Sequence, residues 1–395
     1  MGFFEKIMKL LNALTACLVA FATTASAQTS RMMMPAVSSP AIADDGTELG
    51  ANTTLTSSGI ALGNRVKMRG FVDFRYDYTD LDDLASDDDA RFRTFADVDF
   101  LFDFSPVTGE VHLEASKDGV GLEQAFLRYN FNQDFSLTAG RQLTVLGFEK
   151  DESPNMYQTS YAYLTDVSAD VEGGSEALES FLGINPLAGF SLPNFRRSYV
   201  DGVRLNFNNG QFGFVAGLHN GYFTDNNNLN DGNIGLDIAA SLMIIPGLEF
   251  SLGFGYESNE HYNDTLVPFS GGVLPESDDI SQLNFLLSYQ TGGLTLAFEW
   301  DMWDVYVIDM WNLMFLANYQ FNDVFGLTFR YSHEDFEADV PGGGEGSSNR
   351  FTIGPMFSVT NNLTVGIEYS HAELDSTNTG DTSVDELYAE TIFSF

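Results

Sequence analysis

The chain has 395 residues, and its 56 Asp and Glu far outnumber its 18 Lys and Arg, so the formal net charge is −38 at pH 7. A chain this acidic repels a phosphate backbone, and nucleic acid is therefore not an expected partner. The single cysteine, Cys17, excludes disulfides within the chain.

Residues 1–27 have the pattern of a secretory signal peptide. Two lysines precede a short apolar core, Leu10 to Ala22, which is too short to span a bilayer as a helix. Ala25-Ser26-Ala27 is an Ala-x-Ala cleavage site. An anchor helix is one alternative, and lipoprotein processing at Cys17 is another, although the apolar run continues past that cysteine. We expect export and removal of this segment.

Residues 28–64 are rich in Ser, Thr, Ala and Met and show no periodicity, which predicts a flexible N-terminal extension. From residue 65 to residue 395 the chain becomes a series of segments that alternate between apolar and polar side chains. We predict sixteen strands, over residues 65–79, 91–105, 108–117, 122–131, 134–142, 196–208, 211–222, 233–245, 247–258, 280–290, 293–302, 311–321, 324–334, 349–360, 363–372 and 384–395.

The predicted connections are of two kinds, and the two kinds alternate. Very short ones, such as Asn132-Gln133, Asn209-Gly210 and Asn322-Asp323, have the residues of tight hairpin turns. The others, such as 80–90 and 259–279, are mostly longer and acidic. This asymmetry is typical of outer-membrane barrels. The predicted fold class is therefore all-β, a transmembrane antiparallel β-barrel of about sixteen strands with short periplasmic turns and long extracellular loops.

Aromatic residues of outward parity support a membrane barrel over a soluble sandwich. Phe residues such as Phe321 and Phe325 lie beside the short turns, whereas Trp311 and Tyr331 lie beside the long loops. Two aromatic girdles separated by about one membrane thickness are expected where a barrel crosses the two interfaces of a bilayer. A soluble sandwich has no physical reason for this arrangement.

The last predicted strand ends on Phe395. A final strand that ends on an aromatic residue resembles the closing strand of bacterial outer-membrane β-barrels. That resemblance implies that Phe395 is part of the signal read by the barrel-assembly machinery.

A barrel of sixteen strands leaves a water-filled lumen, so the architecture predicts a diffusion channel. Opposed rows of basic and acidic side chains would set a transverse field that favours small hydrophilic solutes over apolar ones. A salt-bridge network in the lumen is the alternative for any single pair. The predicted pore-lining residues, by parity, are Lys67, Arg69, Arg75, Arg93, Asp97, Asp99, Arg128, Arg204, Glu249, Glu299, Arg330 and Glu368.

The connection at residues 143–195 is the third long one and far exceeds the usual loop length. In general porins the third loop folds into the barrel, and we expect this one to narrow the pore. Its carboxylates would then face the basic residues of the wall, chiefly Arg69, Arg93 and Arg128. An extracellular lid or a trimer contact is the alternative. The predicted constriction residues are Glu149, Asp151, Glu152, Asp166 and Asp170.

Four short segments carry a resemblance to a known family. They are Gly140-Arg-Gln-Leu-Thr-Val-Leu-Gly-Phe-Glu149, Asn155-Met-Tyr-Gln-Thr-Ser-Tyr161, His219-Asn-Gly-Tyr-Phe-Thr-Asp-Asn-Asn-Asn228 and Gly70-Phe-Val-Asp-Phe-Arg-Tyr76. They resemble segments of the beta-barrel porin-2 family, over roughly residues 65–395. The resemblance implies an outer-membrane channel and no particular solute.

The expected function is thus an outer-membrane porin for passive diffusion, with a mild preference for cations because the loops are acidic. A barrel with a plugged lumen that serves as an adhesin or structural protein is the alternative, and an outer-membrane hydrolase is a further one. Against a hydrolase, the chain contains no His-Glu-x-x-His and no Gly-x-Ser-x-Gly pattern.

We predict no cofactor and no metal site. Segment 80–90 is rich in Asp, but its spacing fits no EF-hand. Expected partners are outer-membrane lipid and lipopolysaccharide and, by analogy with other sixteen-stranded porins, two further copies of the chain in a homotrimer.

Overall fold

The computed structural model describes residues 60–81, 89–117, 119–149, 156–163, 199–221, 234–258, 279–305, 308–338, 344–377 and 380–395. No helix in these segments is long and apolar enough to cross a membrane. Within the same segments the chain forms one antiparallel sheet. Its strands are β1 (Ile60–Ala61), β2 (Val66–Leu81), β3 (Asp89–Phe104), β4 (Val107–Ser116), β5 (Gly119–Asn130), β6 (Phe135–Leu143), β7 (Tyr199–Asn208), β8 (Phe212–His219), β9 (Ile234–Ile245), β10 (Leu248–Ser258), β11 (Asp279–Thr291), β12 (Leu294–Val305), β13 (Ile308–Gln320), β14 (Phe325–Ala338), β15 (Glu345–Thr360), β16 (Leu363–Ser376) and β17 (Thr382–Ser394).

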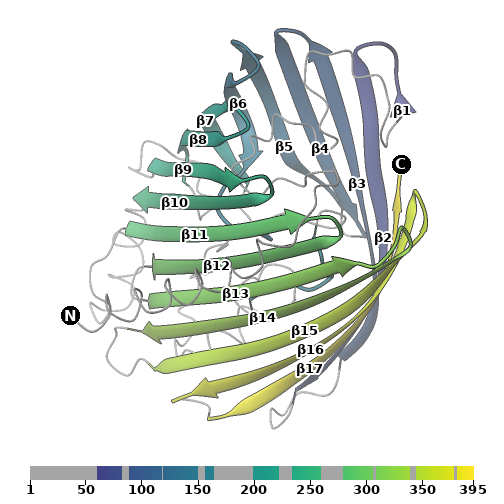
Figure 1. Cartoon of the computed structure of the whole chain (residues 1–395), viewed down its shortest axis with the longest axis vertical. Helices are drawn as coiled ribbons and strands as arrows, with labels where there is room; N and C mark the ends of the chain where they lie inside the picture. Colours follow the sequence, from purple (N-terminus) through teal and green to yellow (C-terminus); the bar gives the residue numbers. More distant parts are fainter. Residues whose placement is uncertain are drawn as a thin grey trace.

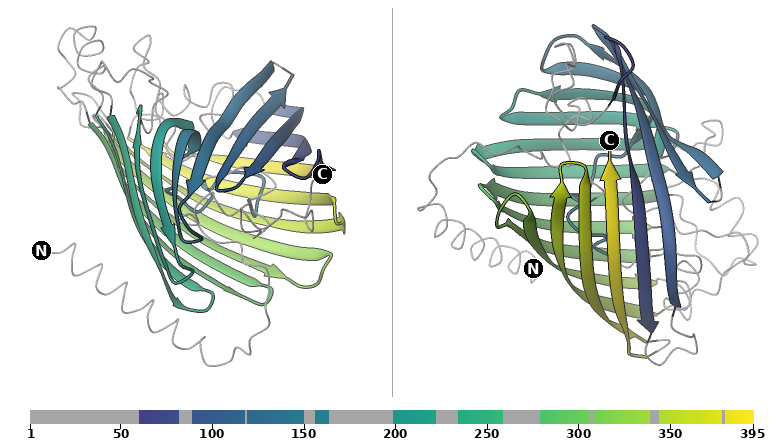
Figure 2. Two further views of the ribbon diagram at one scale, coloured as in Figure 1. Left: turned by 90° about the horizontal axis from the view of Figure 1, so that it is seen from above. Right: turned by 90° about the vertical axis from the view of Figure 1, so that its right-hand side faces the viewer.

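The sheet is a closed barrel. Each strand from β2 to β16 pairs with the next one in the chain, and β17 pairs back onto β2, from Val384 opposite Leu81 to Ser394 opposite Phe71. Figure 1 shows the strands following one another around the wall, and Figure 2 shows the yellow β17 alongside the purple β2. Sixteen strands therefore form the barrel, which confirms the predicted fold class.

The closing seam continues past the end of β17. The backbone of Phe395 exchanges two hydrogen bonds with Gly70, at 3.0 and 2.9 Å. Two residues before Gly70 on β2, Met68 begins a short pairing with β1, which also includes Lys67. The N-terminal extension was predicted to run to residue 64, but its residues 60–61 join the sheet here, and residues 28–59 lie outside the described part of the chain.

Several strands extend further toward the long loops than their alternating pattern predicted. β14 ends at Ala338 and β16 at Ser376, each four residues beyond the predicted end, and β15 begins four residues early at Glu345. The reason is that outward positions become polar near the loops, for example His333 and Asp335, so the sequence loses its alternation while backbone pairing continues.

The outer face of the barrel is apolar and the inner face is polar. In β14, Phe329 is 40% exposed whereas its neighbours Thr328 and Arg330 are both fully buried. The same inversion recurs around the wall, with Phe92, Leu127 and other large apolar side chains exposed. A soluble barrel would have the opposite polarity, and this one matches a barrel whose outer surface faces lipid.

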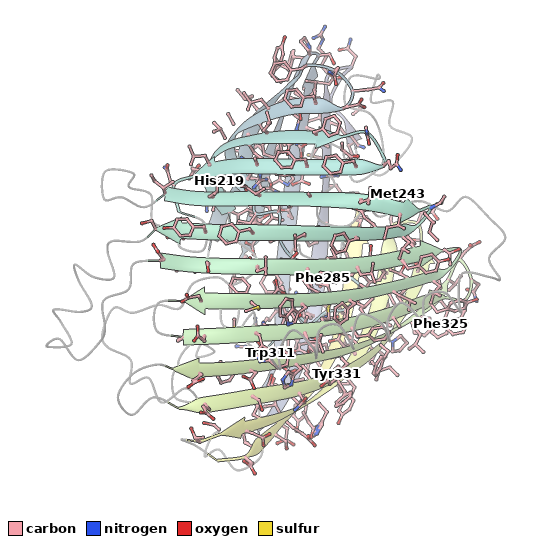
Figure 3. The ribbon with its side chains drawn as sticks, turned by 60° about the vertical axis from the view of Figure 1, so that its left-hand side comes forward. His219, Met243, Phe285, Trp311, Phe325 and Tyr331 are labelled. Atoms are coloured by element: carbon pink, nitrogen blue, oxygen red, sulfur yellow. The ribbon has the colours of Figure 1, made fainter. Side chains whose placement is uncertain are left out.

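Aromatic side chains on the outer face gather toward both ends of the strands. At the short turns, Phe325 packs on Phe321 and Phe357, with ring centroids 5.2 Å apart in both pairs. Near the opposite end, Trp311 packs on His333 at 4.7 Å. Figure 3 shows Phe325 at the short-turn end, with Trp311 and Tyr331 farther toward the long loops. This agrees with the predicted pair of girdles.

Candidate functional site: the inner wall of the barrel

All twelve residues predicted to line a pore lie on the shielded inner side of the wall, and none is exposed. They differ in how deeply they are covered. Arg69, Arg75, Arg93 and Glu249 are half-buried. The buried ones are Lys67, Asp97, Asp99, Arg128, Arg204, Glu299, Arg330 and Glu368. Shielding of this kind is expected of inward-facing side chains, and that these residues line an open pore remains a prediction.

On β2 and β3 the basic residues pair with carboxylates of the same wall. Arg69 lies directly opposite Asp99 in the register, and its Nε is 2.9 Å from Asp99 Oδ2. Arg93 Nε is 2.9 Å from Asp77 Oδ2. The guanidinium groups keep some exposure, 16% for Arg69 and 17% for Arg93. These pairs match the alternative reading of a salt-bridge network.

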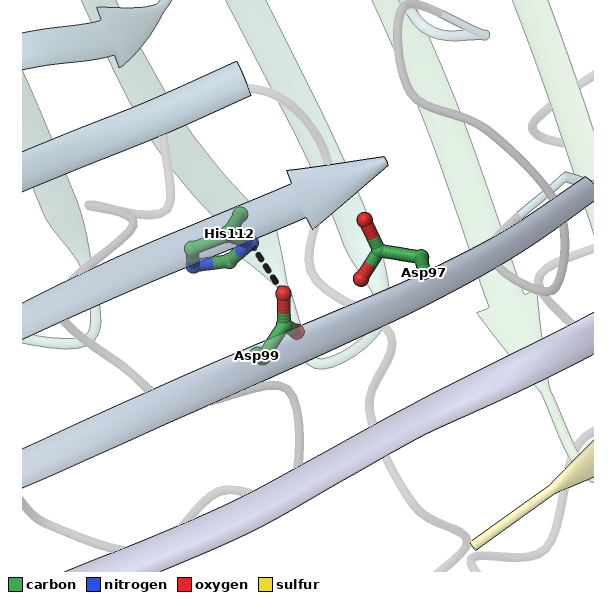
Figure 4. A group of neighbouring side chains, drawn as sticks. All are labelled: Asp97, Asp99 and His112. Carbon is green, nitrogen blue, oxygen red and sulfur yellow. Dashed lines mark ion pairs between the residues drawn. The ribbon is translucent and has the colours of Figure 1, made fainter. Parts of the chain in front are cut away.

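The same row continues to β4, where His112 lies opposite Asp99. His112 Nδ1 is 2.7 Å from Asp99 Oδ1, and its Nε2 is 3.0 Å from Glu110 Oε2. Asp97 of β3 points toward the same place, as Figure 4 shows. His112 and Glu110 were not among the predicted site residues, although their inward parity two residues apart on one strand would have placed them together.

A second polar cluster joins β7 to β9. Arg204 of β7 and Asp237 of β9 form an ion pair at 3.0 Å, although β8 lies between them. The residue between them in the register is Gly217, where an added Cβ would overlap Asp237. A missing side chain on the middle strand therefore lets the arginine reach across it. Arg204 also donates to the carbonyl of Leu143, at the end of β6 (2.9 Å).

The described residues of the long third connection lie inside the barrel, against the wall formed by β12 to β17. We call 144–149 the first flank and 156–163 the second flank. In the first flank the Phe148 amide donates to Glu299 Oε1 of β12 at 3.1 Å. Glu149, only 5% exposed, accepts a hydrogen bond from Arg330 of β14 at 2.5 Å.

Backbone groups of the second flank attach it to side chains of the wall. The amides of Thr159 and Ser160 donate to the two oxygens of Glu368 on β16, at 2.7 and 3.2 Å. Arg330 donates to the carbonyls of Ser160 and Tyr161, at 2.9 and 2.7 Å. Arg330 thus joins the two flanks, because the same guanidinium also holds Glu149.

Apolar contacts complete the attachment of the flanks. Phe148 and Tyr157, one from each flank, stack with centroids 6.1 Å apart and planes 2° apart. Burial raises the pKa of the Tyr157 hydroxyl, which therefore stays protonated and donates to Thr295 at 3.3 Å. Beneath them lies a small apolar cluster formed by Ala162, Tyr163, Ala297, Met314 and Leu316.

The partner of Glu149 is a basic residue of the inner wall, as expected of the carboxylates of this connection, but it is Arg330 and not one of Arg69, Arg93 and Arg128, which were expected to be the chief partners. The other predicted constriction residues, Asp151, Glu152, Asp166 and Asp170, lie outside the described residues. That this segment sets the width of a pore remains a prediction.

Comparison with known proteins adds structural likeness only. No protein-family model and no curated protein sequence matches the chain. The outer-membrane channel DcaP of Acinetobacter baumannii aligns with a TM-score of 0.58 and 11% identity, over 86% of this chain and 100% of its own. OprB of Pseudomonas putida aligns with a TM-score of 0.59 and 12% identity, over 84% and 94%. An anion-selective porin from Comamonas acidovorans aligns with a TM-score of 0.54 and 13% identity, over 84% and 99%.

The chain has a porin-like fold. At these identities the likeness shows the fold and not the substrate. The more specific resemblance to the beta-barrel porin-2 family stays a prediction.

Proposed function

We propose that the protein is an outer-membrane porin, a channel for passive diffusion of small hydrophilic solutes and ions. One observation carries the proposal: a closed barrel of sixteen strands exposes apolar side chains outward and directs charged side chains inward. Such a wall is stable in lipid, because the closed sheet leaves no unpaired strand edge among β2 to β17. Its strand number is one at which a lumen stays wet in other barrels.

A mild preference for cations is part of the proposal. Residues 205–329, which include β8 to β13, contain no Lys or Arg but several Asp and Glu. Carboxylates without lysines or arginines on the same arc attract cations, and the acidic net charge adds to the effect at the mouths.

The experiment is reconstitution of folded protein into a planar bilayer. We expect discrete conductance steps and, across a salt gradient at low ionic strength, a reversal potential of cationic sign. The preference should fade near 1 M salt, where the Debye length is about 3 Å. Folded protein that gives no steps would refute the channel, and a reversal potential of anionic sign at low salt would refute only the selectivity.

A plugged barrel is the second candidate, and one observation favours it. The two flanks cover β12 to β16 so completely that Arg330 is 0% and Arg350 1% exposed. If the flanks and the rest of the third connection fill the lumen, the protein would be an adhesin or structural barrel. The same bilayer experiment separates the two candidates, because a plugged barrel gives no steps.

The proposal includes residence in the outer membrane after export, contact with lipid and lipopolysaccharide, and assembly by the barrel-assembly machinery. It also includes a homotrimer, which chemical crosslinking in membranes would test. It does not include catalysis. His219, His333 and His371 contact carboxylate or amide oxygens, which supports structural roles for them.

A further inference from the structure

Three side chains of the inner wall converge between β3 and β4. The ligand atoms of Asp97, Asp99 and His112 all lie within 4.8 Å of one another, and each residue is at least nine-tenths buried. Figure 4 shows Asp97 and Asp99 on one strand facing the ring of His112 on the next. We propose that this cluster binds a divalent transition-metal ion, with Zn²⁺ the best fit, through one imidazole nitrogen and two carboxylate oxygens.

The contacts of the His112 ring support this role. Both ring nitrogens face a carboxylate oxygen, Nδ1 facing Asp99 and Nε2 facing Glu110. An ionised carboxylate only accepts hydrogen bonds, and a neutral imidazole donates from one nitrogen only. With Nε2–H donating to Glu110, Nδ1 either shares a second hydrogen with Asp99 Oδ1, as a protonated ring does, or binds a cation that takes the place of this hydrogen.

Two neighbouring groups fix the orientation of the ligands. Metal-binding histidines usually donate their second ring N–H to a carboxylate, which sets the tautomer and orients the ring, and Glu110 is placed to do so at 3.0 Å. Arg69 holds the other oxygen of Asp99, Oδ2, at 2.9 Å. Asp99 Oδ1 is therefore the oxygen that remains directed at His112 and the proposed ion.

The geometry requires a small adjustment. Nδ1 and Oδ1 are 2.7 Å apart, whereas two ligands bound at about 2.0–2.1 Å to a tetrahedral zinc ion lie about 3.3 Å apart. Nδ1 and Oδ1 must therefore separate by about 0.6 Å. The Asp97 carboxylate, whose ligand atom lies within 4.8 Å of the other two, must also close toward the spacing of about 3.3 Å, and side-chain rotation can supply both movements. When the ion binds, the hydrogen shared between Nδ1 and Oδ1 leaves as a proton, so one divalent ion enters and one proton is released.

The chemistry of the ligands selects the ion. Imidazole suits zinc, copper and nickel, whereas calcium and magnesium prefer shells made of oxygen only. Three protein ligands leave a fourth position for water or an anionic solute, as in open zinc sites. The imidazole thus distinguishes this site from clusters of carboxylates alone, which bind hard cations.

The test is isothermal titration of the full-length folded protein in detergent with Zn²⁺, after treatment with a chelator and in millimolar Mg²⁺ to occupy nonspecific acidic sites. We expect one saturable site. His112→Asn should abolish it, and Glu110→Gln should weaken it by roughly 10- to 100-fold while leaving the three ligands in place. Heat-modifiable migration on a gel verifies that each variant is folded.

His371→Asn is the matched control. His371 of β16 also pairs with an aspartate, Asp385 at 2.9 Å, but the side chains of this pair are 35% and 39% exposed. Its loss should leave zinc affinity unchanged. X-ray absorption of the zinc-loaded protein should show one imidazole in the shell. If His112→Asn does not fold, Asp97→Asn takes its place. The proposal is overturned if the wild type binds no zinc, if the folded variant binds zinc as tightly as the wild type, or if the zinc shell contains oxygen ligands only. Because binding is measured in detergent, the result does not depend on whether the barrel conducts.

Discussion

Replacement of Arg330 by Met should release the third connection from the barrel wall without opening the barrel. Arg330 is fully buried in the middle of β14, where its guanidinium holds Glu149 at 2.5 Å and the Ser160 and Tyr161 carbonyls at 2.9 and 2.7 Å. Met has similar length but donates nothing, so Glu149 would become a buried charge without this partner. The backbone pairing of β14 with β13 and β15 does not involve the side chain.

The size of the effect follows from these contacts. Removing one partner of a buried ion pair costs about 3–5 kcal/mol, because the other charge is left unpaired. This corresponds to a shift of roughly two to three and a half powers of ten in the docking equilibrium of the flanks. A docked state that dominates in the wild type should then share the population with an undocked one. Arg330→Lys should be intermediate, since an ammonium keeps the charge but not the planar fork.

The assay is single-channel recording in a planar bilayer. We expect Arg330→Met to add a current level of higher conductance, or to raise the mean conductance, relative to the wild type. Arg128→Met is the control, because Arg128 is also fully buried but contacts wall residues, Thr138 at 3.4 Å and Glu110 at 3.7 Å. If both variants conduct like the wild type, or if both change alike, the flanks do not control the current and the reasoning fails.

Three further outcomes are expected. Deleting Phe395 removes two backbone hydrogen bonds at the seam, and it should lower the amount of heat-modifiable barrel recovered from outer membranes; wild-type recovery would contradict this. Gly70→Ala should destabilise the barrel by about 1–3 kcal/mol, because its Cβ would overlap a backbone oxygen of β3, whereas Gly366→Ala meets open space and should unfold in detergent and urea like the wild type. Replacing residues 150–190 with a short Gly-Ser link should raise conductance, admit larger sugars in a liposome-swelling assay and weaken the cation preference. Removal of residues 339–343 is the control and should change none of these properties. Equal effects of the two deletions would count against a constriction.

Parity was enough to predict which face of the wall each residue occupies. In a barrel between lipid and water both faces carry a strong constraint, so β14 alternates Thr328, Phe329, Arg330 and Tyr331 without exception at mid-strand. Hairpin turns of fixed length then set the register between neighbours. The pair Arg69 and Asp99 therefore follows from sequence alone, once the β2–β3 register is known.

Contacts across the lumen did not follow from the sequence. The partner of Glu149 depends on the path of the first flank, and neither a period of two nor a turn length specifies that path. The inward apolar residues Met314 and Leu316 likewise contradict a purely polar lumen, and only the position of Ala162 and Tyr163 above them explains their type. The ion pair between Arg204 and Asp237 could be predicted only from the register of three neighbouring strands, together with the glycine on the middle strand, Gly217, that leaves room for it.

The burial of the arginines divides the inner wall into two parts with different roles. On β14 and β15, Arg330 and Arg350 are covered by the flanks and bind backbone carbonyls, so they act as anchors of the third connection. On β2 and β3, the side chains of Arg69 and Arg93 retain 16% and 17% exposure, although the carboxylates of Asp99 and Asp77 with which they pair are more deeply buried. An ion that crosses a conducting barrel would therefore meet the β2–β4 side, where charges remain accessible, and not the β12–β16 side, where they are occupied. On this reasoning a metal ion held by Asp99 and His112 would lie beside the conducting path, and zinc should lower the current through the wild type but not through His112→Asn.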